Sequence, residues 1–545
     1  MNTLDLKVGK IHDSWSSGNN LRRSFLLIFL LLVFSPLVAL VIEFVQSWAA
    51  NHSNWLWLSV PTGRRLVLLI QSLGLALCVA LGTTILGFFA AICLWRWHRG
   101  AARYLRWFVL LLFIIPPYVH ALAWISLVTQ INSLLRVLGL DPVPFQGWFA
   151  SWWIQFMALT PIAIGMTLIG LESVDPDLIG AARLVRPDIH SLMKVALPLA
   201  KPLIVAGGGF VFLLSLTDYS VPSLFHLNVY PLEIFAEYSA SSEPSRAFLL
   251  AIPFLLITIL VLAASQMALR NAVQKPLWHI RPWPVAPVWP EWLLYLQRPS
   301  LVVLASQVLV PLFVLIIAVG SWENMIQSIT SAHREIVFTL WFSAVTAIAC
   351  IPLAFAPASQ LLRRDFQGKI WWLVVTLPLA VPAPLIGIGL IAVWNRPFFS
   401  GIYGSEVMPI LANLARFVPL AALALLAQLR RIDPILIDAA RVYQTHSIKT
   451  WIQIRLPMLA PGLLAAGCIV FALSAGELAA TLMVAPPGQA TLTMRIYNYL
   501  HYGASESVAG LCLMMMVLGL IVGLISIVVL RGWLRFFMRR SMVRP

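Results

Sequence analysis

The chain has 545 residues, 60% of them hydrophobic and only 11% charged, and its mean hydropathy is +0.88. This balance excludes a soluble domain of that length and is typical of a protein that lies in a membrane. Lys and Arg outnumber Asp and Glu by 37 to 21, which gives a net charge of +16. Such an excess is explained either by nucleic-acid binding or by basic residues that set the orientation in a membrane.

Apolar segments near 20 residues long recur along the whole chain, and each is long enough to cross roughly 30 Å of hydrocarbon. They lack the alternation of apolar and polar residues that marks the strands of a membrane β-barrel. We therefore predict an all-α polytopic membrane protein with about twelve transmembrane helices. The predicted spans are 24–45, 66–95, 107–129, 148–171, 202–222, 248–269, 301–320, 337–360, 370–394, 407–428, 461–484 and 508–530.

The positions of the basic residues indicate the topology. With the N-terminus inside, most Lys and Arg fall in segments on the inner side of the membrane. This positive-inside bias predicts that both termini are cytoplasmic. The polar segment 1–23 is too long for a typical cleaved signal, so we expect the first span to be retained. Topology thus explains the basic charge, and we predict no nucleic-acid partner.

The cysteines carry no recognisable chemistry. None lies in a CxxC motif or near a pair of histidines, and all lie in apolar spans. We interpret them as small hydrophobic side chains and predict neither a disulfide framework nor a metal site. They are Cys78, Cys93, Cys350, Cys468 and Cys512.

The spans divide into two halves, 24–269 and 300–530. Between them, 270–299 is rich in Pro and Trp, and we expect a stiff, non-helical cytoplasmic linker along the membrane surface. The alternative is a proline-rich ligand for a partner domain. A basic cytoplasmic tail, 531–545, ends the chain. The outer segments are too short to fold as domains, so we expect a separate protein to bind the substrate with high affinity.

One polar pattern occurs in both halves. Ala-Ala-Arg is followed by Leu-Pro, by a further Pro and, sixteen residues after that Pro, by an acid in an apolar run. A duplication of this kind predicts a pseudo-symmetric membrane machine with two equivalent contact points in the water phase. The pattern comprises Ala181, Ala182, Arg183, Leu197, Pro198, Pro202 and Asp218 in the first half, and Ala439, Ala440, Arg441, Leu456, Pro457, Pro461 and Glu477 in the second.

The first copy predicts a small helix–turn–helix. Asp175 and Pro176 are typical of a helix start, and Pro187 breaks the helix. A second short helix over 189–197 should end at Pro198. Ile179, Ala182 and Leu184 would form a compact apolar face. Such a unit suits a docking knob that anchors in the groove of a partner, whereas the alternative is a pair of amphipathic helices that lie on lipid.

These residues resemble the EAA loop of ABC-importer permeases, the membrane subunits that dock on cytoplasmic ATPases. The family loop reads Glu-Ala-Ala, three residues, Gly, and then Leu-Pro about a dozen residues later. Asp438 and Gln444 replace the Glu and Gly in the second copy. Gly180 and Arg186 replace them in the first copy, which is also one residue shorter between the alanines and Leu-Pro. The implied coupling residues are Ala181, Ala182, Arg183, Leu184, Leu197, Pro198, Asp438, Ala439, Ala440, Arg441, Gln444, Leu456 and Pro457.

The resemblance covers essentially the whole chain and is to the fused twelve-span permeases of the ferric-iron and thiamine importer group. It implies a type I permease fold of two six-helix halves in the bacterial inner membrane. The implied partners are two cytoplasmic ATPase subunits, a periplasmic or lipid-anchored substrate-binding protein and membrane lipid. The run around 476–503 is most similar to the iron-type members. Thiamine, polyamine and organophosphonate importers share the architecture.

The sequence has no phosphate-cradling GxxxxGK[ST] motif. We therefore expect a transport subunit and not an enzyme, with no cofactor of its own and with ATP bound by the partner subunits.

The two acids lead to a second hypothesis. Asp218 and Glu477 should lie late in their spans, near the outer third of the membrane, where a charge needs a partner or water. They either line a path that attracts cations or cap helix ends and fix the outer gate. Paired prolines break corresponding spans and act either as gate elements or as static kinks. These prolines are Pro116, Pro117, Pro382 and Pro384.

Two other classes of protein remain open. An ion-gradient-driven secondary transporter would use Asp218 and Glu477 as proton or sodium sites, but it gives no reason for the duplicated loops. A membrane scaffold explains neither the paired acids nor the paired prolines. Neighbouring genes for an ATPase and a secreted binding protein would support the importer.

Overall fold

The computed structural model describes residues 19–49, 53–96, 115–273, 287–363, 365–432, 454–502 and 505–542, with the single positions 109, 112, 435, 436 and 439. Throughout these residues all regular structure is helical, as predicted. Ten helices within the described ranges are long and apolar enough to cross a membrane, and one bent pair adds an eleventh. The predicted third span runs partly through residues outside this description.

The long helices of the first half are α2 (Asn19–Ala49), α3 (Arg64–Arg96), α5 (Pro117–Val137), α6 (Gly147–Glu172), α9 (Leu197–Thr217) and α12 (Pro244–Val273). Those of the second half are α13 (Glu291–Val319), α15 (His333–Leu361), α16 (Phe366–Thr376), α17 (Ala383–Trp394), α19 (Val407–Leu429), α22 (Leu456–Ala475) and α25 (Ser505–Met542). A short 3-10 helix, Leu377–Ala380, continues α16.

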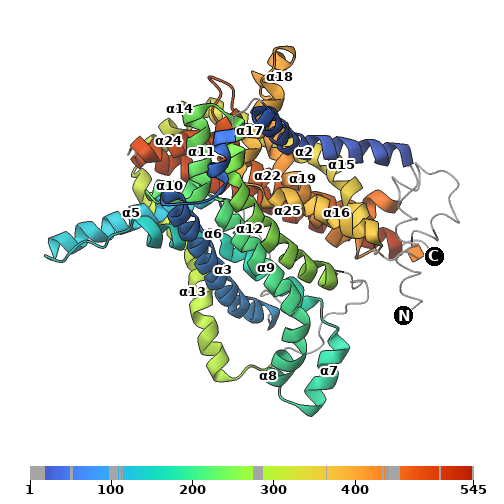
Figure 1. The fold of residues 1–545 in the computed structure, drawn as a ribbon. Coiled ribbons are helices and arrows are strands. Elements are labelled where there is room, and N and C mark those ends of the chain that lie inside the picture. The colour runs from blue at the N-terminus through green and yellow to red at the C-terminus, as the bar shows by residue number, and fades with distance from the viewer. Residues whose placement is uncertain are drawn as a thin grey trace.

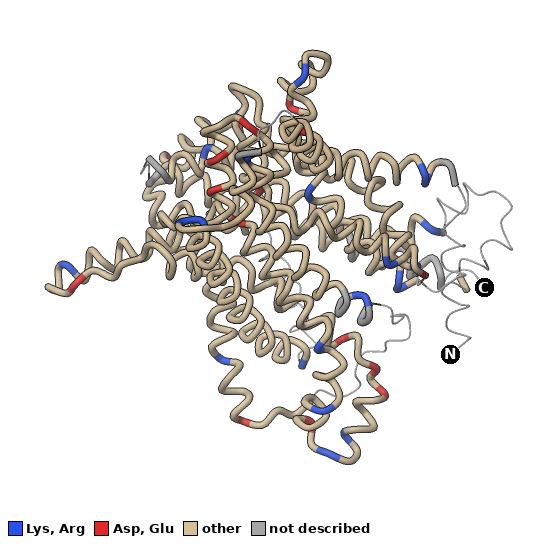
Figure 2. Tube along the Cα trace, in the orientation of Figure 1, with Lys and Arg blue, Asp and Glu red and all other residues tan. Residues whose placement is uncertain are grey.

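Short helices gather at the two ends of the bundle. At one end lie α10 (Ser220–Leu224), α11 (Tyr230–Ser241), α14 (Trp322–Ser331), α18 (Ser400–Tyr403) and α24 (Leu492–Tyr502) (Figure 1), and α23 (Thr481–Val484) contacts α17 and α19. At the other end of the first half, α7 (Pro176–Val185) and α8 (Asp188–Ser191) project away from the bundle (Figure 1). Charged residues cluster near helix ends and in loops, and long middle stretches carry none (Figure 2).

The paired prolines break their spans, as predicted. Pro116 is the N-cap of α5 and Pro117 its first residue, whereas Pro382 is the N-cap of α17. Proline suits a helix start because its fixed φ is helical and its missing N–H would have no partner there. Before Ala383 the ninth span bends by 99°. Whether these breaks act as gates stays a prediction.

The halves of the sequence are interleaved in space. α2 packs on α17 and α15 of the second half as well as on α12, and α13 packs on α5 and α3 of the first half as well as on α25. The crossing of α2 and α17 is close: a Cβ added at Gly389 would lie 2.4 Å from the carbonyl oxygen of Pro36. The predicted boundary between two halves therefore divides the chain but not the bundle.

Two expectations about helix ends were wrong. The helix after Pro187 does not end at Pro198 but runs on as one apolar helix, Asp188–Thr217. A π-helical turn, Leu192–Ala196, directly precedes Leu197-Pro198, and Ile454 and Arg455 form one before Leu456-Pro457. Such a turn re-pairs the backbone groups that a proline leaves without a partner. The linker is also shorter than expected, because α12 extends to Val273 and α13 begins at Glu291.

We predict that Gly389→Ala lowers the thermal unfolding midpoint of the purified chain. The added methyl group meets backbone, which cannot rotate away, and overpacking of this kind costs about 1–3 kcal/mol. Gly165→Ala in α6 is the matched control, because a Cβ there has no neighbour within 4 Å. Equal midpoints for the two variants would show that the crossing of α2 and α17 is looser than described.

Candidate functional site

The first copy of the polar pattern, residues 175–198, is called the first coupling loop here after the role that the resemblance implies. It has the predicted first helix and the predicted break at Pro187, but its second helix continues into the membrane bundle. The Asp175 carboxylate accepts a hydrogen bond from the N–H of Asp177 at 2.9 Å and caps α7, and Pro176 fills the first helical position. The helix ends where Arg186 turns extended, and Pro187 is the N-cap of α8. Capping and proline geometry thus set the start and the end of α7.

The apolar residues of α7 serve two purposes. Ile179 is buried and fixes the helix to the bundle, but Leu184 and Val185 at its end are 89% and 79% exposed. The prediction that Ile179 and Leu184 share one face was therefore wrong, because five helical positions place them about 140° apart. Exposed apolar side chains on a charged loop form a surface suited to the groove of a partner.

Arg183 binds within the loop. Its Nε donates to Asp188 Oδ1 at 2.6 Å and its Nη2 donates to Asp188 Oδ2 at 3.0 Å. This two-fold charge-assisted contact clamps α7 against α8. Leu197 and Pro198 open α9, which leads from the clamp into the membrane bundle.

The second coupling loop is described only in part. Asp438, Ala440, Arg441 and Gln444 lie outside the described residues. Ala439 is helical and exposed. Leu456 and Pro457 open α22 directly after the π-helical turn, in the same way that Leu197 and Pro198 open α9.

Asp218 follows the last residue of α9. Its Oδ1 accepts from the N–H of Ser220 at 2.9 Å and from the hydroxyl of Ser220 at 2.6 Å. Its Oδ2 accepts from Gln155 Nε2 of α6 at 3.0 Å, and Gln155 Oε1 in turn accepts from the Ser215 hydroxyl at 2.5 Å. These donors are all neutral, so they leave the charge of an ionised Asp218 uncompensated.

Glu477 occupies the matching place after α22 but has a different partner. Arg416 of α19 donates from Nη1 to Glu477 Oε1, and the two side chains are 23% and 3% exposed. The carboxylate also accepts from the backbone N–H groups of Ala480 and Thr481, each at 2.8 Å. Glu477 therefore closes the loop before α23 and is neutralised by an ion pair.

The sequence had suggested that both acids lie within their helices. In the structure both lie just beyond the helix ends. α9 ends at Thr217 and α22 at Ala475, so the predicted spans 202–222 and 461–484 were too long. The side chains accept hydrogen bonds from N–H groups of the next short segment, which lets the backbone turn there. This agrees with the capping role, while contact of either acid with substrate stays a prediction.

The two acid-containing loops meet where the halves join. Tyr219 is buried, and its hydroxyl donates to the carbonyl oxygen of Ala479 at 3.3 Å. Ser223 and Tyr497 share a second hydrogen bond across the halves at 3.0 Å. Pro116 joins them, since a Cβ added at Gly476 would lie 3.4 Å from its Cγ. We call this meeting of 218–223 with 476–481 the outer junction, after the side on which the predicted topology places it.

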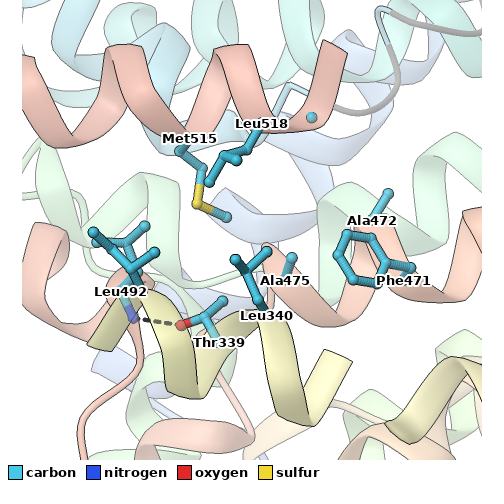
Figure 3. A pocket seen from close by; sticks show the side chains of 10 residues that line it. Thr339, Leu340, Phe471, Ala472, Ala475, Leu492, Met515 and Leu518 are labelled. Atoms are coloured by element: carbon cyan, nitrogen blue, oxygen red, sulfur yellow. Dashed lines mark hydrogen bonds between the residues drawn. The ribbon is translucent and has the colours of Figure 1, made fainter. Parts of the chain in front are cut away.

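A small apolar pocket lies near the outer junction. It is lined by α15, α22, α25 and Leu492, and Met515 and Leu518 point into it (Figure 3). Thr339 supplies its polar edge, where its hydroxyl accepts from the N–H of Leu492 at 2.8 Å. No lining residue is charged. Within the described part of the chain, no three His, Cys, Asp or Glu side chains are grouped to hold a metal ion.

The structure thus brings together Asp218, Glu477 and Pro116 and places the first coupling loop at the opposite end of the first half (Figure 1). Sequence reasoning missed Gln155 and Arg416, the partners of the two acids. A signal was present, because each is a polar residue in an otherwise apolar span and each precedes its acid by about sixty residues.

A comparison with protein families decides the class. The model for the binding-protein-dependent transport system inner membrane component matches residues 83–273 and 350–541, which together exceed half of the chain. The chain belongs to this family. Each match contains one Ala-Ala-Arg pattern and one acid of the outer junction. The permease is therefore a transport subunit and a multi-pass membrane protein, which argues against the ion-driven transporter and the scaffold.

Relatives of known name differ in how much of the permease they cover. A molybdenum transport system permease protein of Haemophilus influenzae is 32% identical over 192 residues, 32% of this chain and 83% of the relative. An Fe(3+)-transport system permease protein of the same organism is 22% identical over 447 residues, 79% of this chain and 84% of the relative. A spermidine/putrescine transport system permease protein of Escherichia coli is 24% identical over 267 residues, which are 47% of this chain and 96% of the relative.

We predict that Glu477→Gln destabilises the permease far more than Asp218→Asn. The first change leaves Arg416 without its counter-charge, and removal of one partner from a buried pair costs about 3–5 kcal/mol. Because Arg416 is partly exposed, we expect Glu477→Gln to lower the free energy of unfolding by about 3 kcal/mol. Asp218→Asn should lower it by about 1 kcal/mol, because the donors to Asp218 are neutral. Denaturant unfolding in mixed micelles measures both. The pair Arg416→Met with Glu477→Gln should regain part of the loss, and a purely additive loss would contradict the ion pair.

Proposed function

We propose that the permease is the membrane subunit of an ABC importer for ferric iron. The observation that carries the iron assignment is coverage: the Fe(3+) relative aligns over 79% of the chain and hence over both halves, whereas the molybdenum and polyamine relatives align over less than half. Thiamine, polyamine and organophosphonate import are the alternatives within the family.

The outer junction supports a positively charged cargo. Glu477 is neutralised by Arg416, but Asp218 has only neutral hydrogen-bond donors, so an ionised Asp218 contributes net negative charge where the halves meet. A path with this charge favours a metal ion or an amine over an oxyanion such as molybdate.

The energy for transport comes from partner subunits in this proposal. Two cytoplasmic ATPases bind the two EAA loops, and the exposed Leu184 and Val185 of α7 enter a groove on the first of them. A periplasmic or lipid-anchored binding protein delivers substrate to the outer end. ATP binding draws the loops together and opens the outer junction, and hydrolysis resets it. Both termini then lie in the cytoplasm of a bacterium, and the chain itself binds no cofactor.

Co-purification tests the ATPase contact. We expect the cognate ATPase to purify with the wild-type permease and to be lost with Leu184→Glu/Val185→Glu and with Ala439→Glu/Ala440→Glu, because buried charge opposes docking in an apolar groove. The control is Leu138→Glu/Leu140→Glu, two exposed leucines at the far end of α5. Failure of the wild type to retain any ATPase would contradict the proposal.

Uptake measurements test the cargo. Deletion of the gene should reduce uptake of radioactive ferric iron by cells at least tenfold and leave spermidine and molybdate uptake unchanged, with rescue by the wild-type gene. Loss of spermidine or molybdate uptake instead would assign the permease to another branch of the family without affecting the ATPase result.

A further inference from the structure

Asp188 holds together segments that are far apart in the chain. Besides the clamp with Arg183, its Oδ2 accepts from the backbone N–H of Val288 at 2.6 Å, across 100 residues. Arg183 lies in α7, Asp188 opens α8, and Val288 belongs to the last described part of the linker. The side chains of Arg183 and Asp188 are 20% and 13% exposed, so the clamp is partly shielded from water, whereas Val288 donates to it from an exposed position.

Packing fixes the linker beside this bond. Trp289 is buried, and its ring stacks on Trp95 at the end of α3 with 6.3 Å between centroids and 25° between planes. Pro290 then starts α13, and Leu293 is buried one turn later. Ile179 of α7 belongs to the same contiguous apolar core as these residues. Figure 1 shows the lower end of α13 leading toward α8.

The second half of the sequence lacks this acid. Counted from the Ala-Ala-Arg pattern, the position of Asp188 falls on His446, and counted back from Leu-Pro it falls on Ser447. The arginine is present in both copies, as Arg183 and Arg441. The linker occurs only once in the chain. An acid is thus found in the copy that meets the linker and not in the other, as expected if its purpose is to hold the linker.

We propose that Asp188 is a positioning residue that joins the first coupling loop to the start of the second half. A displacement of α7 then reaches α13 through Val288, in addition to the direct route along α9. α13 packs on α5, whose N-cap Pro116 lies at the outer junction, so this route leads to the far end of the bundle. The inference rests on the proposed function in one respect, namely that an ATPase docks on α7.

The joint has a specific use in this chain. The first EAA copy departs from the family pattern at Gly180 and Arg186 and is shorter than the second copy by one residue. Its α7 is held to the bundle by Ile179 and to α8 by the Arg183 clamp. The linker contact adds support from outside the loop, which keeps α7 in place for docking at a lower ordering cost.

Hydrogen exchange on the full chain in lipid nanodiscs, with and without its ATPase, tests the joint. Asp188→Leu removes the acceptor together with the Arg183 clamp, and Val288→Pro removes the donor N–H while it leaves the clamp in place. We expect each to weaken ATPase binding about tenfold, the size of one hydrogen bond to a charged group. In the wild type, ATPase binding should alter exchange of residues 291–297, and in both variants this response should disappear. The control Asp177→Asn, which changes an exposed acid of α7, should behave as wild type.

A charge exchange separates the clamp from the joint. Arg183→Asp combined with Asp188→Arg restores an ion pair between α7 and α8 but gives Val288 no acceptor, so we expect it to lose the response at 291–297. Asp188→Asn keeps a carbonyl acceptor for the Val288 N–H and should retain most of the exchange response at 291–297. Thermal midpoints, measured first, separate misfolding from loss of the joint, and Val288→Pro leaves both clamp side chains in place.

Three results would overturn the inference. If Asp188→Leu and Val288→Pro bind the ATPase and respond as wild type does, the joint fails while the proposed function stands. If the exchanged pair responds fully, the clamp alone is sufficient and the linker contact is incidental. If the wild type binds no ATPase, the proposed function fails and the coupling with it. In that case, faster hydrogen exchange of the Val288 amide in Asp188→Leu would show that the hydrogen bond exists but not that it couples the loop to an ATPase.

Discussion

Backbone polar groups that water cannot reach determine how this permease is built. In hydrocarbon each N–H and C=O needs a partner from the protein, so a helix can end or bend only where a side chain or an altered turn provides one. Asp218 and Glu477 provide acceptors where α9 and α22 stop, and π-helical turns precede the Leu-Pro pairs where those helices begin. The outer junction follows from these local solutions, and so do the turns by which the chain passes from each coupling loop into the bundle.

The duplicated architecture carries different chemistry in its two copies. At the outer junction a neutral Gln155 faces Asp218, whereas a charged Arg416 faces Glu477. In the coupling loops the acid Asp188 occurs only in the first copy. Fusion into one chain permits this divergence, because each half always meets the same partner half, and the sites need not be self-complementary as in a symmetric dimer.

Composition, span length and the repeat predicted the helical membrane class, the duplication and the first helix of the first loop with its break at Pro187, because these follow from local rules. They could not predict the exchange of α2 and α13 between halves, which depends on contacts across hundreds of residues, or the partners of the acids, which lie on other helices about sixty residues earlier. Prolines misled the reading of 189–198 for a physical reason: a π-helical turn lets a membrane helix continue through Pro198. Apolar runs likewise hid the ends of α9 and α22.

The interleaving also bears on how motion passes through the permease. Neither half can move as an isolated body, because α2 is packed between α12 and α17 and α13 between α25 and α5. A rigid element that contacts both halves transmits displacement wherever its two ends are fixed. α13 meets the outer part of the bundle through α5 at one end, and Val288 and Trp289 hold its other end to the first coupling loop and α3. Because the linker holds one end of α13 to the first coupling loop, it is part of the transport machinery as well as a covalent connection.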